Sequence, residues 1–188
     1  MALACSMKKV LLHVCCGVCA GAPIKRLKDE GFEVEALFFN PNIHPFSEYV
    51  RRLETCRRVT GALGVVLVEG RYLWQEWMDE CRQYAKEPEG GKRCQVCFYI
   101  RLREALRVCE ERNCDYFTTT LTISPHKKSR DVFSIGRSLG EKSFLEIDFK
   151  KKEGFKKTLL KAKEMSLYRQ NYCGCVYIKK AVSRNFWA

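Results

Sequence analysis

Residues 10–17 read VLLHVCCG, an apolar run broken only by His13 and followed at once by two cysteines and a glycine. A short apolar run that ends at a turn signal is typical of a buried strand. We therefore expect a strand over Val10–Cys15, with both cysteines near its carboxyl end. Ligands of open α/β sheets bind beyond the carboxyl ends of the strands, so the cysteines lie where a site is expected.

Beyond this strand, strand-like and helix-like patterns alternate to the end of the chain, without a repeat or a linker. Such alternation indicates parallel strands joined by crossover helices. We predict a single α/β domain over residues 1–188: a Rossmann-like, doubly wound, mostly parallel five-stranded sheet with a C-terminal helical segment that contains cysteines. The expected strands are Val10–Cys15, Val34–Phe39, Val65–Val68, Tyr116–Leu121 and Phe144–Ile147. The expected helices are Pro23–Glu30, Ser47–Gly61 (with Ser47 as N-cap), Tyr72–Ala85, Cys97–Arg112, Lys128–Leu139 and Gly154–Met165.

The chain is basic, with 34 Lys and Arg against 22 Asp and Glu and a net charge of +12. A field of this sign attracts polyanions, with nucleic acid the first candidate and a membrane surface the second. No stretch approaches the roughly 18 unbroken apolar residues of a membrane helix, and the first residues lack the apolar core of a signal peptide. We expect a cytoplasmic protein that does not enter a membrane.

The chain contains twelve cysteines. Disulfides are rare in a reducing cytosol, so this number points to metal binding or redox catalysis. Three groups stand out: Cys15, Cys16 and Cys19; the Cys94-x-x-Cys97 pair; and the Cys173-Gly174-Cys175 pair. The isolated cysteines are expected to pack as small apolar residues; they are Cys5, Cys56, Cys81, Cys109 and Cys114.

A structural zinc ion usually takes four ligands, often from two C-x-x-C pairs. Only one separated C-x-x-C is present here, and adjacent cysteines on an extended chain point to opposite faces. A [4Fe–4S] cluster usually takes four thiolates, and Cys15, Cys16, Cys94 and Cys97 supply four. This pattern favours iron–sulfur over zinc, although spacing alone leaves both open.

The roles of the remaining candidates stay open on the residues alone. Cys173 and Cys175 can form a strained, easily reduced disulfide or a pair of metal ligands. Cys19 can ligate a second metal, act as a pocket thiol or simply pack. The loop over residues 40–45 is either a binding loop or a turn, and residues 118–128 form either a phosphate site or a threonine-rich strand followed by solvated lysines. His13 is either a proton donor or, as we favour, a hydrogen-bonded strand residue.

Six segments spread over most of the chain carry a resemblance to a known family. They are LLHVCC (11–16), FFNPNIHP (38–45), EYVRR (48–52), CQVCFYIRL (94–102), TTTLTISPHKK (118–128) and YRQNYCGC (168–175). In this order they resemble the cobalamin-independent epoxyqueuosine reductases, the QueH family. The family's first motif often reads Cys-Cys-Ala-Pro, whereas this chain has Gly17-Val18, a change that alters the turn but keeps the thiols.

The resemblance implies a Rossmann-like fold and the reductive deoxygenation of epoxyqueuosine to queuosine at the tRNA wobble position, the last step of queuosine biosynthesis. It implies a [4Fe–4S] cluster, a redox-active pair formed by Cys173 and Cys175, and an additional single iron with Cys19, Cys173 and Cys175 as candidate ligands. The implied cluster ligands are Cys15, Cys16, Cys94 and Cys97. The partners would be tRNA that carries epoxyqueuosine and an electron donor such as a ferredoxin or flavodoxin.

Three rival interpretations remain. A cluster-dependent tRNA thiolase would need an ATP-binding loop after the first strand, where this chain has cysteines. A zinc-stabilised nucleic-acid-binding module would hold a colourless metal and give Cys173 and Cys175 no redox role. An electron carrier would show no affinity for tRNA.

Overall fold

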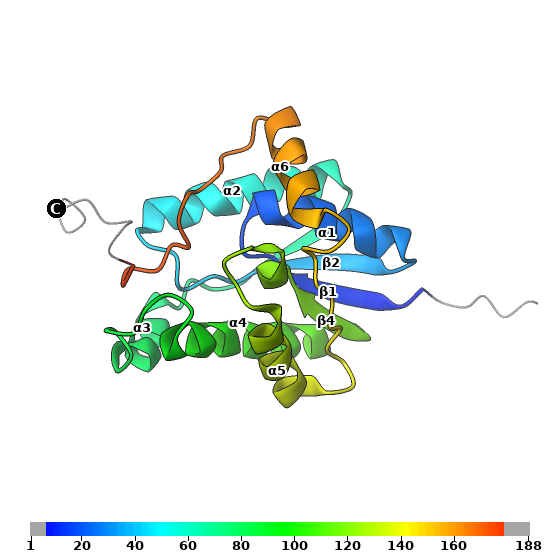
Figure 1. The fold of residues 1–188 in the computed structure, drawn as a ribbon. Helices are drawn as coiled ribbons and strands as arrows, with labels where there is room; N and C mark the ends of the chain where they lie inside the picture. The colour runs from blue at the N-terminus through cyan, green and yellow to red at the C-terminus, as the bar shows by residue number, and fades with distance from the viewer. Residues whose placement is uncertain (1–6, 179–188) are drawn as a thin grey trace, which may run out of the picture.

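A parallel sheet of four strands runs through the middle of the molecule in the computed structural model, which describes residues 7–178 (Figure 1). The strands are β1 (Lys9–His13), β2 (Glu33–Phe38), β3 (Val66–Glu69) and β4 (Tyr116–Thr119), in the order β3-β2-β1-β4. Every neighbouring pair is parallel, with Leu12 of β1 opposite Ala36 of β2 and Thr118 of β4. The expected α/β class with a parallel sheet is confirmed.

Helices cover both faces of this sheet (Figure 1). One layer contains α1 (Gly17–Asp29), α2 (Phe46–Ala62) and α6 (Gly154–Glu164); the other contains α3 (Trp74–Arg82), α4 (Lys92–Glu111) and α5 (Ser129–Gly140). Each layer has its own apolar cluster against the sheet, and Val10, Leu11 and Leu12 of β1 are completely buried between them. A strand covered on both faces has no polar alternation, which explains the apolar run at residues 10–12.

The prediction of a fifth strand over Phe144–Ile147 is wrong. Only an isolated parallel bridge joins Phe144 to Phe117. Further along, threonine hydroxyls take the place of strand amides: Thr118 Oγ1 donates to the Leu145 carbonyl at 2.8 Å and Thr122 Oγ1 to the Ile147 carbonyl at 2.8 Å. Because these bonds come from side chains, the segment lies beside β4 without forming a regular series of backbone hydrogen bonds with it.

Two helices begin earlier than expected, and both differences matter for the cysteines. α1 begins at Gly17 and contains Pro23, so Cys16 is its N-cap residue. α4 begins at Lys92, which places both Cys94 and Cys97 within its first two turns. Ser47 is not a cap, because α2 begins at Phe46 after the cis His44–Pro45 peptide bond and no side chain caps it.

Residues 166–178, here called the strap, follow α6 and contain no helix or strand. The strap runs from α6 past α2 toward the opposite helix layer (Figure 1), where the Tyr177 ring lies 6.0 Å from that of Trp77 in α3. Between α5 and residue 178 only α6 is helical, and Cys173 and Cys175 lie outside any helix or strand. No helix among residues 7–178 has the length and apolar character needed to cross a membrane.

The isolated cysteines behave largely as expected. Cys56 and Cys81 are completely buried in the two apolar clusters and Cys109 nearly so, whereas Cys114 is half-buried. Cys5 lies outside the described residues.

Gly17 allows α1 to approach α2 closely. A Cβ atom at this position would lie 2.4 Å from the carbonyl carbon of Thr55 and 2.7 Å from the amide nitrogen of Cys56. Because backbone atoms cannot yield as a side chain can, we expect Gly17→Ala to lower the free energy of unfolding by about 1–3 kcal/mol. Chemical denaturation would measure the change.

Gly61 provides a control, because its replacement by alanine should change the free energy of unfolding in the opposite direction. It lies inside α2, and a Cβ there would meet nothing within 4 Å. Gly61→Ala is therefore expected to stabilise the protein by about 0.5–1 kcal/mol through helix propensity. Equal effects of the two substitutions would show that α1 and α2 are not tightly apposed.

Candidate active site

Three thiols converge where β1 passes into α1. The Sγ atoms of Cys15, Cys16 and Cys19 all lie within 4.8 Å of one another, and those of Cys15 and Cys16 are 4.0 Å apart. The chain turns from strand to helix at these residues, so the adjacent cysteines escape the opposite-face geometry of an extended strand. Cys19 thus belongs with the first pair, which the sequence had left open.

A second thiol pair lies at the beginning of α4. Cys97 is buried and Cys94 half-buried, and the Gly90 amide donates to the Cys94 sulfur at 3.2 Å. The buried Arg93 guanidinium holds the preceding loop by donating to the Tyr84 carbonyl at 3.2 Å and to the Ala85 carbonyl at 3.1 Å. Both thiol groups therefore lie at helix N-termini, where the helix dipole stabilises negative charge such as that of a thiolate.

Two cavities open beside these helix ends. The first, of about 360 Å³, is bordered by Cys15, Cys19 and Cys173. The second, of about 330 Å³, is bordered by Cys94, Cys97, Cys173 and Cys175. Cys173 therefore lies on the wall shared by both cavities, and the strap connects the two thiol groups. The other shared wall residues are Glu89, Arg101, His126 and Lys127.

The three thiols between β1 and α1, Cys15, Cys16 and Cys19, fit a bound metal. With metal–sulfur bonds of about 2.3 Å in a tetrahedron, ligand sulfurs lie about 3.8 Å apart, close to the 4.0 Å between Cys15 and Cys16. This close grouping suits three ligands on one metal ion. A four-thiolate cluster is larger, and its donors would come from the α1 and α4 thiols that border the adjoining cavities.

Ionisation of the three thiols is strongly coupled. The pKa of Cys15 lies well below its usual range, because the thiols of Cys16 and Cys19 donate to its thiolate. For the same reason the pKa of Cys16 is raised to about 12, and that of Cys19 is also raised. A bound cation would favour deprotonation of all three thiols.

The thiols of the strap are protonated at neutral pH in the structure. Burial raises the pKa of Cys173, although the nearby charge of Lys127 opposes the rise. Burial, followed by the charge of Cys173, raises the pKa of Cys175 to about 12. Both are free thiols, so the pair is in its dithiol form.

The threonine-rich segment serves the fold and the thiols more than a phosphate. Thr118, Thr119, Thr120 and Thr122 are all buried. Thr120 Oγ1 accepts from the Cys15 amide at 3.0 Å and donates to the Cys15 sulfur at 3.4 Å. Of the two interpretations of residues 118–128, the threonines therefore fit the buried strand. From the rest of the segment, Ser124 borders the first cavity, and His126 and Lys127 border both.

His13 is a structural residue, as favoured above. Its Nε2 lies 3.1 Å from the Phe39 carbonyl, which can only accept, so Nε2 carries the proton. Nδ1 then accepts from Thr119 Oγ1 at 2.8 Å. Burial, followed by the charge of Arg101, lowers the pKa of His13 to about 4. Both ring nitrogens are occupied, so His13 does not donate a proton to a ligand.

Two cations lie in the shared wall: Lys127, one of the lysines of the candidate phosphate segment, and Arg101, to which the sequence analysis gave no role. Arg101 is only 4% exposed, and its one hydrogen bond runs from Nε to the Cys97 carbonyl at 3.1 Å. Within residues 7–178, neither Arg101 nor Lys127 has a carboxylate partner. Both side chains therefore place positive charge on the shared wall.

Comparison with known proteins decides the family. The sequence matches the model of the family described as epoxyqueuosine reductase QueH over residues 10–181. The chain belongs to the QueH family. An epoxyqueuosine reductase QueH from Streptococcus pyogenes serotype M1 is 36% identical over 180 residues, which cover 91% of this chain and 70% of that relative. The QueH of Dehalococcoides mccartyi is 34% identical over 173 residues, covering 90% and 91% of the two chains.

A solved structure with a partial likeness is the U34-tRNA thiolase NcsA from Methanococcus maripaludis with its [4Fe–4S] cluster. The TM-score is 0.44 at 11% identity, and the match covers 85% of this QueH chain and 65% of the thiolase. At this level the likeness carries no argument for thiolase chemistry.

Proposed function

We propose that this QueH chain reduces epoxyqueuosine to queuosine in tRNA. One observation carries the proposal: a member of the epoxyqueuosine reductase family has the Cys173 thiol on the wall between two thiol-lined cavities. The proposal includes a single Rossmann-like domain and a cytoplasmic reaction, since cytoplasmic thiols stay reduced.

In the proposed reaction, the two thiols of the strap supply the electrons and protons that the substrate takes up. Conversion of an epoxide to an alkene takes two electrons and two protons and releases one water. Oxidation of Cys173 and Cys175 to a disulfide supplies both electrons and both protons. A ferredoxin or flavodoxin would then restore the dithiol.

The proposed cofactor is a [4Fe–4S] cluster with ligands from Cys15, Cys16, Cys94 and Cys97. Four thiolates are the usual ligand set of such a cluster. A further single iron would have Cys19, Cys173 and Cys175 as candidate ligands. When bound, the cluster would supply single electrons, and the further iron would supply Lewis acidity toward an epoxide oxygen.

Anaerobic purification followed by metal analysis tests the cofactor. A brown protein with about four irons per chain is expected for one cubane, and about five if the further iron is present. An assay with epoxyqueuosine-containing tRNA would then be expected to yield queuosine. A colourless protein that holds zinc when prepared without oxygen would contradict the proposal and favour a zinc-stabilised nucleic-acid-binding module.

Lys127 tests the contribution of the shared wall to RNA binding. If its unpaired ammonium meets an RNA phosphate, Lys127→Gln should raise the KM for tRNA. It should also reduce the dependence of log affinity on log salt by about 0.7–0.9. Filter binding at several salt concentrations would measure this slope. Lys25→Gln is the control, because Lys25 is exposed and pairs with Asp29 far from the cavities; equal slopes in both variants would contradict RNA contact at Lys127.

A further inference from the structure

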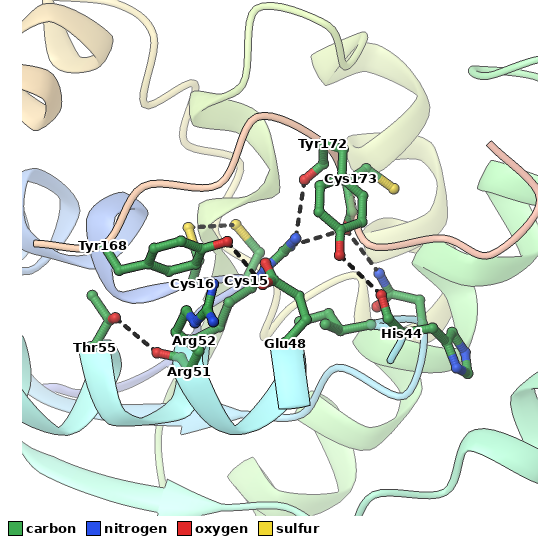
Figure 2. Close-up of polar contacts among 12 residues, drawn as sticks. Cys15, Cys16, His44, Glu48, Arg51, Arg52, Thr55, Tyr168, Tyr172 and Cys173 are labelled. Carbon is green, nitrogen blue, oxygen red and sulfur yellow. Dashed lines mark hydrogen bonds and ion pairs between the residues drawn. The ribbon is translucent and has the colours of Figure 1, made fainter. Parts of the chain in front are cut away.

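The guanidinium of Arg52 lies beneath the strap and donates hydrogen bonds to its backbone. Nη1 donates to the Cys173 carbonyl at 3.1 Å, and Nη2 donates to the Tyr172 carbonyl at 3.2 Å (Figure 2). Arg52 is only 2% exposed. A planar fork that bonds two successive carbonyls fixes the register of this segment independently of its side chains.

Glu48 orients this guanidinium from the preceding turn of α2. Its Oε1 accepts from Arg52 Nε at 2.6 Å, and both side chains are buried. Its other oxygen accepts from the Tyr168 hydroxyl at 2.8 Å, so the strap contacts both members of the ion pair (Figure 2). The charge of Arg52 is thus neutralised, and the donors of its fork point at the strap.

The loop before α2 donates further hydrogen bonds to the strap backbone. The Gly174 carbonyl accepts from the His44 amide at 2.9 Å, and Asn42 Nδ2 lies 3.4 Å from the Cys173 carbonyl. The carbonyls of residues 172, 173 and 174 therefore all accept from groups within residues 42–52. Each of these carbonyls lies beside or between the two cysteines, and none of the four hydrogen bonds involves a thiol.

Gly174 packs closely against the residues that bind the strap backbone. Its φ of +97° is one that other residues rarely adopt, and a Cβ there would lie 3.1 Å from Ile43 Cα and 3.3 Å from Arg52 Nη1. The turn between the two cysteines is therefore pressed against the same surface that binds its carbonyls.

We propose that Arg52, oriented by Glu48, is a positioning residue for the Cys173–Cys175 pair. By holding the backbone on both sides of the Cys173 side chain, it keeps that thiol on the wall between the cavities. The redox role of the pair rests on the proposed function, but the position of the thiol is a property of the free protein. The two can therefore be tested separately.

Thiol accessibility tests the position directly. In the full chain prepared without oxygen, Arg52→Gln should raise the alkylation rate of Cys173 about tenfold, the factor that 1.4 kcal/mol represents. Mass spectrometry of the tryptic peptide over residues 170–179 would follow both cysteines. In the tRNA assay, kcat should fall while KM for tRNA changes little. Arg57→Gln is the matched control, because Arg57 lies on the same helix as Arg52 and its ion pair, with Glu69 of β3, is exposed.

Two further variants distinguish loss of the guanidinium geometry from loss of charge and from loss of folding. Arg52→Lys keeps the charge but replaces three nitrogens in one plane, which bond Glu48 and the two carbonyls, with a single ammonium that cannot reproduce this geometry. It should therefore show the same raised alkylation rate and low kcat as Arg52→Gln. Restoration of wild-type values by lysine would overturn the positioning role. Tyr168→Phe removes one hydrogen bond to Glu48 and should raise the alkylation rate of Cys173 severalfold. If Arg52→Gln does not fold, this variant tests the positioning role in its place. An unchanged alkylation rate in Tyr168→Phe would overturn the proposal.

The remaining outcomes are also decisive. A folded Arg52→Gln variant with the alkylation rate of the wild type would overturn the inference. A raised alkylation rate with unchanged kcat would support the positioning of Cys173 by Arg52 and overturn the redox role of the pair in the proposed function. If the wild-type protein does not reduce epoxyqueuosine, the proposed function fails, while the alkylation comparison still decides whether Arg52 positions Cys173.

Discussion

Replacement of Cys173 by serine is expected to abolish turnover of epoxyqueuosine-containing tRNA. Serine keeps the shape and hydrogen-bonding capacity of the side chain but cannot form a disulfide, so the strap can no longer supply two electrons. The residues proposed as cluster ligands are unchanged, and the brown colour should therefore persist. Single-turnover assays on anaerobic protein, together with its visible spectrum, would measure both effects.

Cys114→Ser provides the control for this experiment. Cys114 is a half-buried free thiol next to β4 that borders neither cavity. Its replacement should leave turnover within the range of the wild type. Full activity in Cys173→Ser would remove the dithiol from the reaction, whereas loss of both colour and activity would indicate that Cys173 holds the metal centre.

Replacement of Glu48 by alanine is expected to destabilise the protein by about 3–5 kcal/mol, the cost of leaving one member of a buried ion pair without its partner. Glu48 and Arg52 are 6% and 2% exposed, so solvent cannot replace the missing charge. The Tyr168 hydroxyl loses its acceptor as well. For a chain of this size the melting temperature should fall by roughly 10 °C, which calorimetry would measure.

The Arg57–Glu69 pair supplies the comparison for this prediction. It has the same chemistry and a contact of 2.7 Å, but its side chains are 51% and 41% exposed. Glu69→Ala should therefore cost no more than about 1 kcal/mol. Similar losses in the two variants would show that burial of the Glu48 pair adds little.

The sequence predicted the central features of the fold because they depend on local patterns. The apolar run at residues 10–14 identified β1, and the parallel sheet followed from the alternation of elements. The position of Cys15 and Cys16 beyond the carboxyl end of β1 followed from the same rule. Gly17 was interpreted as the turn that ends the first strand and as a departure from the family's motif, whereas the structure shows that it also lets α1 approach the α2 backbone.

The errors have physical causes that a one-dimensional pattern does not contain. Phe144–Ile147 is apolar enough for a strand, but threonine hydroxyls from a distant segment occupy its carbonyls. Arg52 appeared in the sequence analysis only within the EYVRR segment of the family resemblance, without a role of its own. Its burial depends on a strap more than a hundred residues later in the chain, at separations of 120 and 121 residues. Arg101 was missed for the same reason, since only the assembled cavities show that it lacks a counter-charge.

The sequence separation between the strap and α2 has a consequence for biosynthesis. Residues 168–178 leave the ribosome after every other residue that borders the two cavities. Contacts across so many residues also carry a large loop-closure cost and form late in folding. The thiols at the beginning of α1 and α4 can therefore be in place, and open to metal delivery, before Cys173 arrives to complete the wall between them.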